Sequence, residues 1–172
     1  LIAHLRRWTE QSGPEAQANV LLWLAKTLMQ HADDAHEGVG LIEHAVTIEG
    51  REAALEVLSS FLRHPDHDGS AWLNAVHGAA TLFETLLDAD ADAALLALAE
   101  GARLRVLPEG PEAQAQRLRV AKLLTDSGDN QTAFALFSQC LYFVGADEEI
   151  EGQLHLLAER LNNWTALAEL FL

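Results

Sequence analysis

Apolar residues recur every three or four positions along almost the whole chain, between short segments rich in proline and glycine. In the segment 132–144, Ala133, Phe137, Cys140 and Val144 fall on one side of a helix, because an α-helix turns once in about 3.6 residues. No segment of similar length alternates apolar and polar residues as a half-buried strand does. The pattern therefore predicts an all-α fold. We expect helices over 1–10, 14–30, 34–48, 51–63, 70–88, 91–106, 111–126, 130–144, 147–161 and 163–172.

The hexapeptide Gly-Pro-Glu-Ala-Gln-Ala occurs twice, at 13–18 and at 110–115. Proline in a first helical turn loses no hydrogen bond, and glutamate is favoured at the positive end of the helix dipole. Alanine then allows close packing. We interpret each copy as the start of a helix and assign it no chemical role.

Predicted connections between the helices are short, which makes successive helices antiparallel. We expect helical hairpins at about 1–30, 34–64, 70–107, 111–145 and 147–172. The pairing of the N-terminal helices is the least constrained part of this grouping. In it, the first hexapeptide copy begins the second helix of a hairpin, whereas the second copy begins the first helix of a hairpin.

A spacing of 34 residues relates the last segment to the one before it. It places Gly128, Asp129 and Asn130 on Asn162, Asn163 and Trp164, and it pairs Val120 with Leu154, Ala133 with Leu167 and Phe137 with Phe171. A two-helix unit of 34 residues is the period of the tetratricopeptide repeat (TPR).

The segment 114–147 resembles a repeat of that family. Ala121 stands where a small residue lets two helices approach, Ala133 and Phe137 stand as the small and aromatic pair of the second helix, and Cys140 as its second small residue. The segment 49–65 is similar to a second helix of the same kind. The resemblance implies one TPR-like helical repeat domain over 1–172, folded as a right-handed α-solenoid of about five antiparallel hairpins.

The resemblance weakens in the middle of the chain. The predicted helices between Pro65 and Pro111 are longer than the family's, and Ala54 and Ala133 lie further apart than two 34-residue units would place them. A related α-solenoid with irregular hairpins is therefore the open alternative.

Charge narrows the classes of partner. The chain has 26 acidic and 11 basic residues, a formal net charge of -15, which repels nucleic acid and anionic lipid surfaces. No apolar run reaches the length of a membrane span, so we expect no membrane insertion and a cytoplasmic location. Because the chain begins at Leu1 and ends at Leu172 within an apolar pattern, we also expect it to be a piece of a longer protein.

Candidate chemical sites are few. The acidic stretch 88–92 lacks the glycine and the terminal acid of a calcium loop, so we interpret it as a solvated turn that caps the next helix. The histidine and aspartate groups at 31–36 and 64–68 lie in predicted turns, where surface histidine is the default. Cys140, the single cysteine, lies on an apolar stripe, where burial raises a thiol pKa. We predict no catalytic residue, cofactor or metal, and an enzyme is the weakest alternative.

The resemblance implies a function as a non-catalytic scaffold that binds a peptide or partner helix of another protein on a concave surface. The alternative is a helical regulatory or docking domain of a larger multidomain enzyme or signalling protein. The negative net charge of the chain favours neutral or basic partners. Basic residues cluster in only one region of the sequence, in the hairpins 70–107 and 111–145. From this cluster, which also contains Arg105, we predict a partner-binding site made of Arg103, Arg117, Arg119 and Lys122.

Overall fold

A computed structural model of the chain describes residues 13–31, 33–48, 50–63, 70–145 and 147–171. Within these residues it contains nine α-helices and no strand, which confirms the predicted all-α fold. The helices are α2 (Pro14–Leu28), α3 (Ala35–Ile48), α4 (Arg51–Arg63), α5 (Ser70–Leu86), α6 (Ala93–Val106), α7 (Pro111–Ser127), α8 (Asn130–Val144), α9 (Glu148–Leu161) and α10 (Trp164–Leu170).

The helix boundaries follow local chemistry that the sequence already displays. Both hexapeptide copies begin a helix, with Pro14 and Pro111 at the first helical positions of α2 and α7, as predicted. Asp92, in the acidic turn, caps α6 by accepting a hydrogen bond from the Ala94 amide at 3.0 Å. The predicted helix at 1–10 lies outside the described residues.

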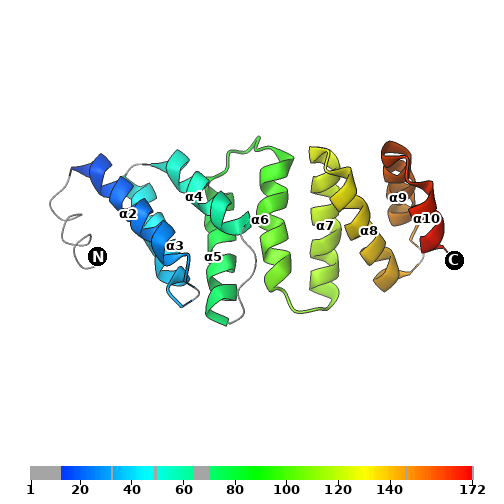
Figure 1. The fold of residues 1–172 in the computed structure, drawn as a ribbon, viewed down its shortest axis with the longest axis horizontal. Coiled ribbons are helices and arrows are strands. Elements are labelled where there is room, and N and C mark those ends of the chain that lie inside the picture. Colours follow the sequence, from blue (N-terminus) through cyan, green and yellow to red (C-terminus); the bar gives the residue numbers. More distant parts are fainter. Residues whose placement is uncertain (1–12, 32, 49, 64–69, 146, 172) are drawn as a thin grey trace. The chain divides into compact units, whose positions relative to one another are not determined.

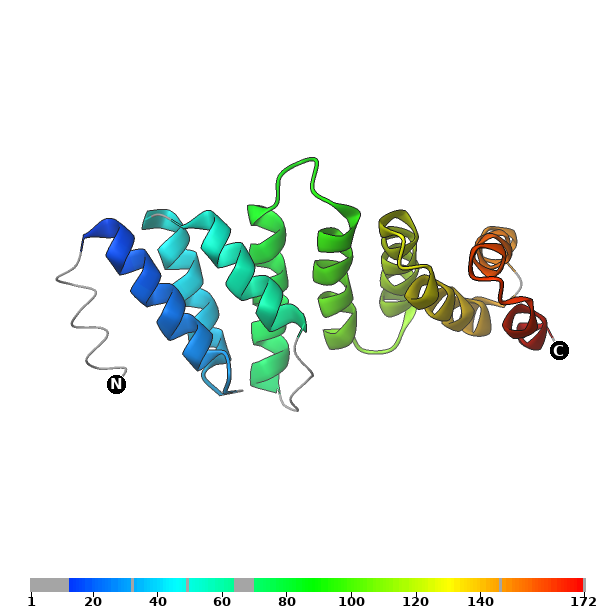
Figure 2. The ribbon, with the colours of Figure 1, turned by 45° about the horizontal axis from the view of Figure 1, so that its top comes forward.

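The chain divides into two compact units, Leu1–Ala89 and Asp90–Leu172, which we describe separately. In the described part of the first unit, α2 packs mainly against α3, α3 also against α5, and α4 against α5 (Figure 1). Helices α2 and α4 lie side by side and run in the same direction in both views (Figures 1 and 2).

Helix α3 packs more extensively against α2 than against α4, whereas the sequence grouping joined it to the helix that follows. Gly38 explains the close approach of α2 and α3. A Cβ atom built on Gly38 would lie 2.6 Å from Met29 Cγ and 3.0 Å from the carbonyl oxygen of Ala25. The absent side chain therefore lets the backbones of α2 and α3 come together.

Helix α4 is held against α5 at both ends. The Arg51 side chain donates hydrogen bonds to the Leu86 carbonyl oxygen at 2.6 and 2.8 Å, which satisfies the C-terminal end of α5. At the other end, the rings of Phe61 and Trp72 lie 4.8 Å apart between centroids. This antiparallel packing fixes the face that α4 turns toward α2.

In the second unit, each helix packs against the next one along the chain from α6 to α10. Buried residues of α7, α8, α9 and α10 form one apolar core, in which Phe137 and Leu154 have no exposed surface. Burial of these side chains is the main favourable contribution to the stability of this unit.

In this unit, residues 34 positions apart occupy equivalent places at the ends and the starts of helices. Gly128 and Asn162 end α7 and α9 in the left-handed conformation, with φ of 86° and 50°. Asp129 and Asn163 then cap α8 and α10 by accepting hydrogen bonds from backbone amides three residues ahead. The correspondence is weaker further on: Phe137 is fully buried, but 49% of Phe171 is exposed.

Candidate functional site

The four predicted basic residues lie on α6 and α7 of the second unit, and two of them share one carboxylate. Glu100, only 3% exposed, receives Arg119 Nε at 2.8 Å on Oε1 and Arg103 Nη1 at 3.4 Å on Oε2. Gln116 Nε2 donates to the same Oε2 at 2.5 Å. A buried carboxylate of this kind is stable only with such partners, so the network joins α6 to α7.

Arg117 and Lys122 pair with other acidic residues of the same unit. Arg117 Nη2 lies 2.9 Å from Glu109 Oε1, and its guanidinium is 5.5 Å from the ring centroid of Phe143. Lys122 Nζ lies 2.6 Å from Glu149 Oε1. The side chain of Arg117 is only 8% exposed, so its charge acts within the unit.

Each predicted basic residue thus has an acidic partner inside the protein. The side chains of Arg119 and Lys122 are 69% and 45% exposed, so these two remain accessible to a binding partner. The basic site stays a prediction, and the structure adds that a partner there would compete with existing ion pairs.

Cys140 belongs to the core of the second unit, as the sequence pattern predicted. Burial raises the pKa of its thiol, and the positive charge of Arg117 offsets part of that rise. A thiol in this state is a poor nucleophile and packs as a small apolar side chain.

A surface that the sequence analysis missed lies in the first unit, between α2 and α4. Three adjoining hollows, of about 40, 230 and 300 Å³, share lining residues and follow the two helices from Gln30 and Phe61 to Glu15 and Gly50. We call this surface the α2–α4 groove. Its exposed residues on α2 and the turn that follows it recur at helical spacing and are Glu15, Asn19, Trp23, Lys26 and Gln30.

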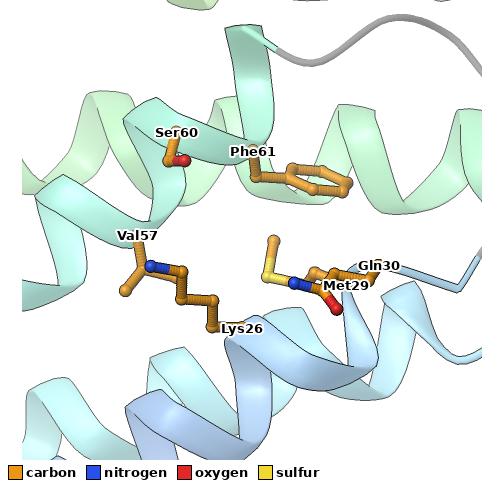
Figure 3. Close-up of a pocket in the computed structure, with 6 residues that line it drawn as sticks. All are labelled: Lys26, Met29, Gln30, Val57, Ser60 and Phe61. Carbon is orange, nitrogen blue, oxygen red and sulfur yellow. The ribbon is translucent and has the colours of Figure 1, made fainter.

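Apolar side chains form the floor of the groove at its Phe61 end. Met29, the C-cap residue of α2, extends toward Phe61 of α4 at the smallest hollow, which Val57 also lines (Figure 3). Both are 5% exposed, and Phe61 is held from behind by Trp72. In the middle hollow, Trp23 stands on the rim with 49% of its surface exposed. An apolar floor beside an accessible aromatic ring is suited to binding an apolar side chain.

The rim of the groove carries charged side chains. Glu15, Glu52, Glu56 and Lys26 are exposed, and none of them forms a salt bridge with any other residue that the structure describes. This contrasts with the basic residues of α6 and α7. Among the described residues, no ion pair would have to break for these charges to meet those of a partner.

A second hollow of the first unit, of about 470 Å³, lies between α3 and α5. His36, Glu43 and His77 are among its lining residues. Within the described part of the chain, no three histidine, cysteine, aspartate or glutamate side chains are close enough to hold a metal ion. The histidine run at 64–68 lies outside the described residues.

The geometry of the α2–α4 groove suits binding and offers no nucleophile held by a base. One feature of the sequence points to it in retrospect: Trp23 lies within an otherwise polar stripe of α2. None of the helices in the described segments is long and apolar enough to cross a lipid bilayer. Comparison of the chain with protein-family models, with curated proteins and with solved structures found no match in any of the three.

Proposed function

We propose that this protein is a non-catalytic interaction scaffold that binds a peptide segment or a helix of a partner protein in the α2–α4 groove. The observation that carries the proposal is the run of three adjoining hollows along the facing surfaces of two parallel helices. A single pocket would suit a small molecule, whereas a continuous groove suits a chain.

The length of the groove is consistent with this ligand. From Glu15 to Met29, the C-cap residue of α2, the chain rises about 21 Å at about 1.5 Å per residue. That span accommodates about six residues of an extended peptide or about four turns of a helix. Trp23 lies near the middle, where interface residues contribute most to affinity.

We further propose that the helices belong to a TPR-like α-solenoid. The equivalent caps 34 residues apart in the second unit support this proposal. So does the parallel arrangement of α2 and α4, each packed on a partner helix, because repeat proteins expose a groove between corresponding helices of neighbouring units.

Selection of random 16-residue peptides on the purified protein tests the function. We expect Trp23→Ala, which removes the rim aromatic, and Ser60→Arg, which fills two of the hollows, each to weaken binding of the selected peptides by about tenfold or more. Leu73→Ala is the control, because this residue of α5 is 40% exposed but does not line the groove.

Isothermal titration calorimetry of each variant gives the dissociation constants, and circular dichroism shows that each is folded. Peptides that bind both groove variants as tightly as the original protein would contradict the proposal. If binding instead falls on replacing Arg119 and Lys122 with glutamine, the basic site predicted from the sequence is the one in use.

A further inference from the structure

We infer that the groove selects a basic segment and binds it in one direction, with its cationic residues at the Glu15–Glu52 end and an apolar anchor in the hollow between Met29 and Phe61. This inference rests on the proposed function and names the chemistry and orientation of its ligand.

The charge of the groove is the first argument. Three carboxylates line it, from Glu15, Glu52 and Glu56, against the single ammonium group of Lys26. None of the three carboxylates forms a salt bridge with another described residue, so a ligand would not have to break one. A cationic ligand would therefore gain attraction without breaking an ion pair between described residues, and the net charge of -15 adds long-range steering.

The second argument is that the two ends of the groove differ. The hollow at one end is lined by Met29, Val57 and Phe61 and carries the ammonium group of Lys26. The hollow at the other end has Glu15 and Glu52 and no large apolar side chain. Reversing the ligand would place its cations beside Lys26 and its apolar residue beside the carboxylates, so both interactions would be lost.

The spacing of the two ends sets the spacing of the ligand's groups. Glu15 and Met29 are separated along α2 by about 21 Å at about 1.5 Å per residue. An extended ligand would therefore carry its cations about six residues from its apolar anchor, and a helical ligand about fourteen residues.

The chemistry is tested with the peptides selected from the random library. We expect lysine and arginine to be enriched among them, and Glu52→Lys or Glu56→Lys to weaken binding about three- to thirtyfold at 50 mM salt, with a smaller effect at 300 mM. Glu43→Lys is the matched control: it makes the same charge change in the same unit but lies in the hollow between α3 and α5. Equal losses with Glu43→Lys would show that net charge alone is responsible and would overturn the inference.

The direction is tested by a nitroxide label placed at the cationic end of a selected peptide. We expect the label to broaden the amide resonances of Asn19 and Glu52 more strongly than those of Gln30 and Ser60. The opposite pattern would overturn the orientation. Peptides that need Trp23 but are neutral or acidic would overturn this inference and leave the proposed function standing, whereas peptides indifferent to Trp23 and Ser60 would overturn the proposed function itself.

Discussion

Two glycines of α3, two residues apart, should respond differently to replacement by alanine. Gly40 has no atom within 4 Å of a Cβ built on it, outside its own helix backbone and chain neighbours. Gly40→Ala should therefore gain only the helix propensity of alanine, about 0.5–1 kcal/mol. Gly38→Ala gains the same term, but its new methyl group would lie 2.6 Å from Met29 Cγ and 3.0 Å from the backbone oxygen of Ala25.

The steric cost at Gly38 decides whether Gly38→Ala raises or lowers the free energy of unfolding. Overpacking of a core costs about 1–3 kcal/mol, and the flexible Met29 side chain can absorb part of it, but the Ala25 carbonyl belongs to a helix backbone and cannot. After the propensity gain, Gly38→Ala should be neutral to about 2 kcal/mol less stable than the original protein. The difference between the two variants, about 1–3 kcal/mol, isolates the contact because the propensity term cancels.

Urea denaturation provides the measurement, followed through amide resonances of α2 and α3 so that the first unit is observed by itself. Gly38→Ala should also shift resonances of Lys26, Val57 and Ser60, because Met29 lines the same hollow. A Gly38→Ala protein as stable as Gly40→Ala would refute the close packing of α2 on α3 and the groove floor that depends on it.

Three further predictions concern the second unit. Glu100→Ala should destabilise it by about 2–4 kcal/mol in urea, because the network that joins α6 to α7 loses its buried carboxylate, whereas Lys122→Ala, which removes an exposed pair, should cost less than about 1 kcal/mol. Phe137→Ala should cost about 3–5 kcal/mol and Phe171→Ala under about 1 kcal/mol, although the two stand 34 residues apart in register; equal costs would contradict their different burial. The raised pKa of Cys140 means that its contribution to the free energy of unfolding is complete below the unfolded thiol pKa of about 8.5 and is lost as the pH rises above it. Cys140→Ala should remove this alkaline slope, and an unchanged slope would show that other groups cause it.

Helix positions were predictable from the sequence because their signals are local. Proline at a first helical position, as at Pro14 and Pro111, and a capping aspartate, as at Asp92, act within one turn of the helix they begin. The packing of α3 was less accessible to sequence reasoning. It depends on Gly38 fitting against Met29, a contact that appears only when two helices are placed together.

The candidate sites, too, were predictable only where their signal is local in the sequence. The sequence displays the basic cluster, but Glu100, Glu109 and Glu149, which neutralise it, become its partners only in the folded unit. The groove was missed because its two walls, α2 and α4, are separated by a whole helix in the sequence. The periodic pattern shows which side of each helix is polar, but it does not show which polar sides face one another.

The pairing of charges explains why the acidic groove is the better candidate for recognition. In a chain with 26 acidic and 11 basic residues, a basic side chain readily finds an acidic neighbour, as Arg51, Arg119 and Lys122 do. Acidic residues exceed the available bases, and the groove between α2 and α4 holds three that form no salt bridge with another described residue, beside an apolar floor. A partner at the basic site would have to displace internal carboxylates, whereas a cationic partner in the groove would meet carboxylates that form no salt bridge with another described residue. We therefore expect the carboxylates of the first unit to contribute more to the recognition of a basic ligand than the basic residues of the second unit contribute to the recognition of an acidic one.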